Sequence, residues 1–180
     1  MSGHNKWSKI KHKKAATDAQ KSKVFSKHAG FIAVESKKAN GDLNSPGLMA
    51  AIERAKKDSM PKDNIERAVS KGTGADGSTI TEVMYETYGP GGTAIIITAV
   101  TDNSNRTTPE IRHILSKLGY QLGGEGSAAW AFTKTADGYA PTSSIELDDA
   151  DGEKLANLVE ALEEHEDVQD VFTTADTPDE

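Results

Sequence analysis

Residues 93–101 read TAIIITAVT, and no other stretch of this chain favours a β-strand as strongly. β-branched residues prefer extended backbone, and a run this long and apolar is typical of a central strand. Gly89-Pro90-Gly91-Gly92 before it is compatible only with a turn, and 82–88 has the composition of a strand. The turn lacks the Gly-Lys-Ser/Thr ending of a phosphate-binding loop and leads into a strand. We therefore predict a tight hairpin centred on this turn.

The residues after the central strand predict a sheet covered by two helices. A polar loop is expected at 102–106, a helix beginning at Thr108-Pro109 and ending at Gly119, and a turn at Asp137-Gly138. Further strands are expected at 127–133, 143–147 and 168–173, with an amphipathic helix at 148–166. From residue 93 onward the predicted order is strand, helix, strand, strand, helix, strand. This order predicts an α+β fold with the ferredoxin-like, split βαββαβ arrangement.

The first part of the chain predicts three short helices instead. Thr17 with Gln20 forms a capping box, Ser45-Pro46 is a good helix start, and Met60-Pro61 begins a third helix that stops at Gly72. The residues expected to face a shared core are Val24, Phe25, His28, Phe31, Ile32, Leu48, Met49, Ile52, Ala55, Ile65, Ala68 and Val69. The Gly-rich loop 72–79 is the expected boundary between two domains, at 1–74 and 80–176.

Charge is divided between these two parts. Residues 1–74 carry 16 Lys and Arg against 7 Asp and Glu, whereas the remaining residues carry 5 against 21. The net charges of +9 and −16 give the −7 of the whole chain. A concentrated positive field attracts polyanions, because each neutralised phosphate releases condensed counterions. The basic part therefore indicates a nucleic-acid partner.

The strongest candidate for contact with nucleic acid is the lysine-rich arm GHNKWSKIKHKK, residues 3–14. Its lysines would contact phosphates, while Trp7 offers a face for an unpaired base. The alternative is that the charges only promote solubility and Trp7 packs on the helices. A second basic cluster precedes and enters the helix at 108, where pairing with acids is equally possible. The full candidate set is Lys6, Trp7, Lys9, Lys11, His12, Lys13, Lys14, Lys21, Lys23, Lys27, Lys62, Arg67, Arg106 and Arg112.

Other chemistries find little support in the sequence. The chain has no cysteine, and the spacing of His4, His12 and His28 fits no common metal site. No nucleophile-and-base pattern surrounds Ser104, and the acids at 146–153 suit a helix N-terminus. No apolar run is long enough to cross a membrane. We expect a cytoplasmic, non-enzymatic monomer without a metal, cofactor or small-molecule substrate.

Five blocks of sequence carry a resemblance to a known family. They are GHNKWSKIKHKKAATDAQKSKVFSK, MPKDNIERAVSKGTG, YETYGPGG, TDNSNRT and LEEHEDVQDVFTTAD. Together they resemble the YebC family, whose members are named as probable transcriptional regulators in bacteria and as a translational activator in mitochondria. The resemblance implies a helical domain followed by ferredoxin-like domains, with no catalytic activity. It also implies either DNA-binding transcriptional control or action at the ribosome, in relief of stalling at proline-rich sequences.

This chain resembles a shortened member of that family. Full-length relatives look longer because a third domain follows the strand that corresponds to 128–134, where this chain has only the link ADGYAPTSS. Three hypotheses for its function stay open. An RNA-binding translation factor suits a flexible lysine arm, and a DNA-binding regulator would need a recognition helix that the sequence does not indicate. A protein adaptor would bind an acidic partner through the arm.

Overall fold

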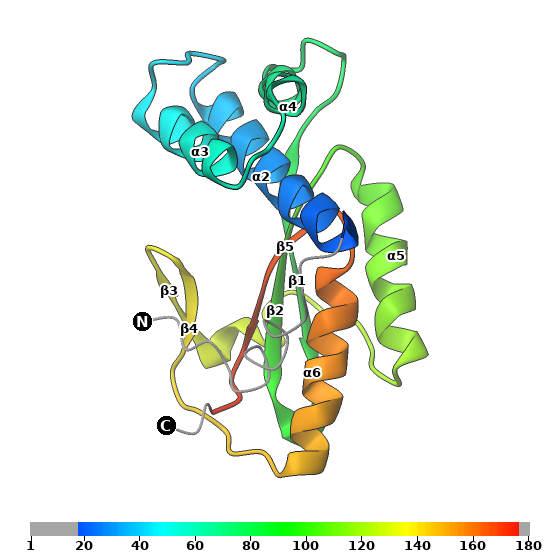
Figure 1. Cartoon of the computed structure of the whole chain (residues 1–180). Helices are drawn as coiled ribbons and strands as arrows, with labels where there is room; N and C mark the ends of the chain where they lie inside the picture. The colour runs from blue at the N-terminus through cyan, green and yellow to red at the C-terminus, as the bar shows by residue number, and fades with distance from the viewer. Residues whose placement is uncertain (1–17, 177–180) are drawn as a thin grey trace.

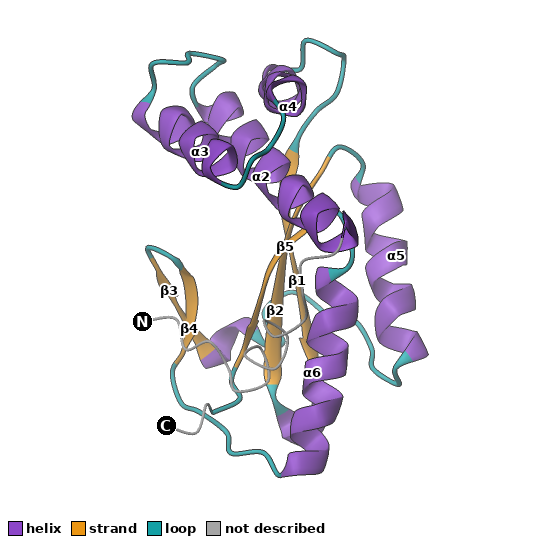
Figure 2. Ribbon diagram, in the orientation of Figure 1, coloured by secondary structure: helices purple, strands orange, loops and turns teal. Residues whose placement is uncertain are grey.

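The computed structural model describes residues 18–176 and shows three helices followed by an α+β part (Figures 1 and 2). The helices are α2 Asp18–Lys38, α3 Pro46–Lys57 and α4 Lys62–Thr73. The α+β part contains β1 Thr81–Tyr88, η1 Pro90–Gly92, β2 Ala94–Thr101, α5 Ser104–Lys117, η2 Ala129–Ala131, β3 Phe132–Thr135, β4 Gly138–Pro141, α6 Asp149–Glu163 and β5 Val168–Thr173. The arm and Thr17 lie outside the described residues. None of the described helices is long and apolar enough to cross a membrane.

The three N-terminal helices share a core of their own, in which Ile32, Leu48 and Ala55 are fully buried. Pro46 occupies the first turn of α3 and Ser45 precedes it in extended backbone, as predicted. Helix α4 does not stop at Gly72. A side chain at Gly72 would approach the carbonyl oxygen of Ala33 to 2.3 Å, so this glycine allows α4 to lie close against α2. The helix ends instead at Thr73, and the capping residue after it, Gly74, adopts the left-handed conformation.

Three apolar residues that were predicted to face this core are exposed. The exposed fractions are 40% for Val24, 43% for Phe31 and 49% for Met49. The prediction assumed that α2 buries one face, but the helix has neighbours on two sides. Ala33 and Val34 are buried on the second side with Ile80, next to the sheet. The buried surface of α2 is therefore centred on 32–34 rather than on 24–32.

Strand β2 is the centre of an antiparallel sheet with the order β1-β2-β5, which confirms the prediction for residues 93–101. Ile95 and Ile97 belong to the core formed with helices α5 and α6, which lie along one face of the sheet (Figure 1). Ile96 points the other way and packs with Ala128 and Phe132. Because both faces are covered, a continuous apolar run suits this strand.

The prediction of a four-stranded βαββαβ sheet is wrong, because the structure has a three-stranded sheet and a separate two-stranded one. Residues 127–131 form turns and η2 instead of a strand, and 143–147 contributes only a single parallel bridge between Ile145 and Ala175. Strands β3 and β4 pair with each other, across the turn expected near Asp137. A strand has two edges, and those of β2 are filled by β1 and β5. The hairpin arm 81–88 thus occupies the place that the predicted topology gave to another strand.

The two helices of the α+β part differ from their predicted bounds at one end each. Helix α5 begins at Ser104, one turn before the predicted start, and contains Pro109. Thr107 anchors this extra turn, because its buried hydroxyl donates to the Asp167 carboxylate at 2.7 Å. Helix α6 begins after Asp148, whose carboxylate accepts the backbone N–H of Asp151. It ends at Glu163 rather than 166.

Candidate nucleic-acid interface

Half of the candidate residues can be placed in the structure. Lys6, Trp7, Lys9, Lys11, His12, Lys13 and Lys14 lie outside the described residues. Of the others, Lys21, Lys23 and Lys27 lie on α2, Lys62 and Arg67 on α4, and Arg106 and Arg112 on α5. The structure therefore distributes the described candidates over three helices.

Helix α2 presents its lysines in different environments. Lys21 is exposed, whereas Lys27 is half-buried where α2 approaches β5. There the charge of Lys27 acts on Asp170. Burial raises the pKa of the Asp170 carboxyl, and the nearby positive charge of Lys27 opposes this rise. Lys27 thus has an acidic neighbour within the molecule, while Lys21 is open to an external anion.

The two candidate residues of α4, Lys62 and Arg67, make weak surface contacts with other described residues. Lys62 is 86% exposed at its side chain and lies 3.5 Å from the Glu66 carboxylate. Arg67 donates to the side-chain oxygen of Asn64. Exposed ion pairs typically contribute about 0–1 kcal/mol, so a phosphate can compete for these cations at little cost. Lys62 and Arg67 are therefore available to a polyanion.

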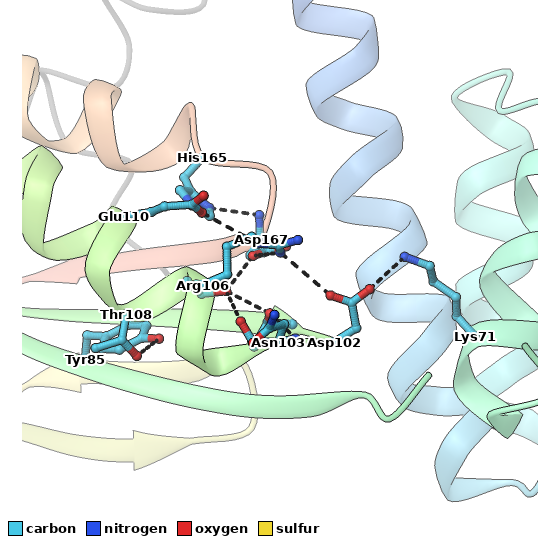
Figure 3. A network of polar contacts seen from close by, with 11 residues as sticks. Lys71, Tyr85, Asp102, Asn103, Arg106, Thr108, Glu110, His165 and Asp167 are labelled. Atoms are coloured by element: carbon cyan, nitrogen blue, oxygen red, sulfur yellow. Dashed lines mark hydrogen bonds and ion pairs between the residues drawn. The ribbon is translucent and has the colours of Figure 1, made fainter. Parts of the chain in front are cut away.

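Arg106 has a different environment, at the centre of a group of polar side chains that we call the seam network (Figure 3). Its guanidinium lies 2.7 Å from Asp167 and 3.7 Å from both Asp102 and Glu110. The hydrogen bond to Asp167 raises the pKa of Arg106 above its ordinary value. The network also contains Lys71 and His165. Three carboxylates surround Arg106, so its main contacts are intramolecular.

The seam network joins the two parts of the molecule. Lys71 of α4 reaches Asp102, at the start of α5, with a distance of 3.4 Å between nitrogen and oxygen (Figure 3). At a separate point of the same seam, Lys37 of α2 donates to the carbonyl of Ile80 at 2.6 Å. These contacts hold the helices against the sheet. Arg112, one turn and a half after Arg106, is exposed and has no ionic or hydrogen-bond partner among residues 18–176.

One side of the network brings together side chains that are typical metal ligands. Glu110, His165 and Asp167 each place a ligand atom within 4.8 Å of the others. His165 Nδ1 accepts the backbone N–H of Asp167, so the ring carries its proton on Nε2 and donates to Glu110 at 2.7 Å. Arg106 already supplies a positive charge to Asp167 and Glu110. The arrangement is therefore complete as an ion-pair network. Sequence reasoning missed it because its members lie far apart along the chain.

Comparison with known proteins gives the family. Residues 5–75 match the family described as the TACO1/YebC protein N-terminal domain, and residues 80–137 match the TACO1/YebC second and third domain. A "Probable transcriptional regulatory protein" of Petrotoga mobilis is 45% identical over 96% of this chain and 70% of its own length. The chain belongs to the TACO1/YebC family.

Two further similarities accompany the TACO1/YebC match. A probable transcriptional regulatory protein of Fervidobacterium nodosum is 36% identical, over 99% of this chain and 95% of its own length. The crystal structure of a conserved hypothetical protein from Aquifex aeolicus superimposes with a TM-score of 0.83 at 32% identity, covering 95% of this chain and 96% of that one. The curated relatives are thus named as regulatory proteins and not as enzymes.

Proposed function

We propose that this chain is a non-enzymatic, cytoplasmic gene-expression factor that binds RNA at the ribosome. The observation that carries this proposal is the separation of charge, +9 in residues 1–74 and −16 in the rest of the chain. The resemblance to the YebC family adds relief of stalling at proline-rich sequences as the specific role. In this proposal residues 1–74 and 80–176 act as two domains of a monomer, the first binding RNA and the second contacting protein.

The described part of the basic domain supports contact with a phosphate backbone. Lys21, Lys62 and Arg67 are exposed, and within residues 18–176 none of them is fixed by a buried ion pair. Lysine acts as a point charge and does not read base edges in the way that paired Arg contacts do. Recognition by shape, as in folded RNA, fits such a surface.

The second candidate is a DNA-binding transcriptional regulator, and the names of the relatives favour it. Helix α4 would be the element available to a groove, since it carries Lys62, Arg67 and Lys71. However, Lys71 is engaged with Asp102 across the seam. The acidic domain would also repel the flanking duplex. Folded ribosomal RNA, recognised by shape, is the better match for a lysine-rich surface.

Sedimentation of the tagged protein from a cell lysate, with and without ribonuclease, tests the proposal. Migration with ribosomal particles that is lost on nuclease treatment or at higher salt supports the RNA role. Retention at the top of the gradient, with binding of the purified protein to duplex promoter DNA, supports the transcriptional role. Binding to particles that resists nuclease would favour a protein adaptor.

The arm has a separate quantitative test. Replacement of Lys9, Lys11, Lys13 and Lys14 by Ala should weaken RNA binding and reduce the slope of log K against log salt by up to about four. The matched control replaces Lys117 and Lys134, which are exposed in the acidic domain, and should leave the slope unchanged. An unchanged slope in the arm variant would remove the arm from the binding site.

A further inference from the structure

The most exposed large apolar side chain among residues 18–176 belongs to Trp130, on η2. Trp130 is 71% exposed, and Tyr88, at the end of β1, is 40% exposed. We call these two residues the aromatic platform. Trp and Tyr are enriched among the residues that dominate binding energies, so this pair of exposed rings is a candidate contact surface.

The platform is fixed by hydrogen bonds at its polar atoms. The indole N–H of Trp130 lies 2.9 Å from both the Tyr88 hydroxyl and the carbonyl of Ser127. The Tyr88 hydroxyl in turn donates to the same carbonyl at 2.6 Å. The polar atoms of both rings therefore have partners within the molecule, and the ring faces remain for a ligand. Because the rings are already ordered, a partner loses little conformational entropy when it binds them.

The base of the platform is a buried carboxylate. Glu86 is 3% exposed and accepts the backbone N–H groups of Gly126, Ala128 and Ala129 at 2.6, 3.0 and 2.5 Å. Burial by itself raises the pKa of Glu86, but these three hydrogen bonds outweigh it and hold the pKa below its ordinary value. A negative charge thus lies beneath the loop that carries Trp130, next to the backbone of its neighbour Ala129.

The charge around the platform selects among possible ligands. Residues 75–180 carry 21 acids against 5 bases, and one of these acids, the exposed Glu125, lies on the loop of the platform. Phosphates are repelled by such a field, whereas cations are attracted both by it and by the faces of aromatic rings. Lys134 of β3 is the only base between Lys117 and Lys154. A basic side chain stacked on Trp130 would therefore contact the ring face and lie in a negative field.

We propose that the aromatic platform of Tyr88 and Trp130 docks a basic, arginine- or lysine-bearing segment of a partner protein. Trp130 is the anchor, since it offers a ring face to the cation, and Tyr88 holds the indole in place. The proposal concerns a surface of the acidic domain and does not depend on RNA binding by the arm. Its failure would leave the proposed function intact, and the reverse also holds.

Titration with a model segment tests the proposal. The probe is the capped octapeptide Arg-Gly-Arg-Gly-Arg-Gly-Arg-Gly, and the readout is the indole N–H resonance of Trp130 in full-length protein. The chain has two tryptophans, so Trp7→Phe leaves Trp130 as the only indole signal. The resonance should shift with the basic peptide, and high salt should reduce the shift. The acidic peptide with Glu in place of Arg should give none.

Affinity measurements with a labelled peptide complete the test. Trp130→Ala should weaken binding of the basic peptide about 3- to 30-fold, the range of an exposed to partly desolvated cation–π contact. The matched control is Leu118→Ala, which removes another exposed apolar side chain, 43% exposed. Tyr88→Phe should weaken binding less, because it removes only the tether.

Three results would overturn the proposal. Equal affinity of Trp130→Ala and the unaltered chain would show that the ring is not the anchor. A shift of the Trp130 resonance with oligouridylate but not with the basic peptide would make the platform a surface for unpaired bases. A large gain in peptide affinity when the arm lysines 9, 11, 13 and 14 are replaced by Ala would show that the chain's own arm competes for the platform.

Discussion

Gln169, in β5, is a polar side chain buried where helix α2 meets the sheet. It is 4% exposed, and neither atom of its amide has a hydrogen-bond partner among the described residues. The side chain fits under α2 because residue 30 is glycine: a Cβ there would lie 2.3 Å from the amide nitrogen. An unpaired buried amide costs about 1–3 kcal/mol, so this contact joins the two parts at some expense in stability.

Gln169→Leu should therefore raise the free energy of unfolding, by about 1 kcal/mol, since it replaces the unpaired amide with apolar atoms of similar volume. Urea unfolding monitored by circular dichroism measures the change. The paired variant Gly30→Ala should destabilise, because the new methyl group overpacks the buried Gln169 amide by more than the roughly 0.8–1 kcal/mol that Ala gains in helix propensity. A loss of stability in Gln169→Leu would mean that the amide does have a polar partner.

Glu86 gives a prediction with a pH dependence. In Glu86→Gln the amide nitrogen would face a backbone N–H, so at least one hydrogen bond is lost and stability should fall by about 1–3 kcal/mol at neutral pH. The folded pKa of Glu86 is depressed below its ordinary 4.5. The stabilisation by the carboxylate is therefore present above that ordinary value and is lost as the pH falls through the folded pKa.

The measurement is the unfolding free energy of both proteins from neutral to acidic pH. The difference between them should be largest near neutrality and should shrink in acid. A difference that stays constant across the range would show that the charge of Glu86 contributes nothing. Glu125→Gln, at an exposed acid on the same loop, is the control and should change stability little.

Residue-level predictions from the sequence succeeded where the signal is local. Asp148 and Pro46 were placed correctly at helix starts, because caps depend on neighbours within a few positions. The seam network was not foreseen, since Arg106 and Asp167 are 61 positions apart and Lys71 and Asp102 are 31 apart. The candidate arm residues stay predictions, because they lie outside the described residues.

At the scale of elements, the close contact of α2 with α4 depends on Gly72. Ala is the better helix former by about 0.8–1 kcal/mol, but a methyl group there would lie 2.3 Å from the Ala33 carbonyl and 2.5 Å from the Ser36 Cβ, so overpacking should prevail over propensity. Gly72→Ala should lower the melting temperature. Gly124→Ala, where a methyl group meets nothing within 4 Å, should not. If Gly72→Ala had the same melting temperature as the unaltered chain, α2 and α4 could move apart to admit the methyl group at little cost.

The sequence predicted strands best in segments that are rich in β-branched and aromatic residues. Strand β5 has the predicted bounds Val168–Thr173, and β2 the predicted central place, since both are rich in β-branched and aromatic residues. Residues 127–133 contain Trp130 and Phe132 but also three alanines, and they begin with a turn. There Glu86, 40 or more positions away, accepts the backbone N–H groups of Gly126, Ala128 and Ala129. These hydrogen bonds to a distant carboxylate therefore determine the backbone conformation at 126–129, and local strand propensity does not.

At the scale of the whole molecule, the β3–β4 hairpin contains the residue at which the second family match ends. The match to the TACO1/YebC second and third domain stops at Asp137, in the two-residue turn between these strands. Strands β3 and β4 pair only with each other and stand beside the sheet (Figure 1). An exposed turn of this kind is where inserted sequence disturbs packing least.

Insertion of a folded domain between Ala136 and Asp137 should therefore change the melting temperature of the host by only a few degrees, since lengthening a loop costs little closure entropy. Insertion of the same domain between Gly91 and Gly92 should unfold the host, because Gly91 lies directly against Leu147. Calorimetry of the two fusions compares them. A host that unfolds in the first fusion would show that the hairpin is needed intact.

The order of the strands also determines when each part of the molecule can fold during synthesis. The core of α2–α4 uses only residues from 25 to 69, so it can form as soon as those residues have left the ribosome. The central strand β2 waits much longer, because one of its two partners is β5, about 75 positions further along the chain. Until Val168–Thr173 emerges, one edge of an apolar strand is unpaired, and such an edge favours aggregation. The nascent chain therefore displays a finished basic domain beside an unfinished acidic one.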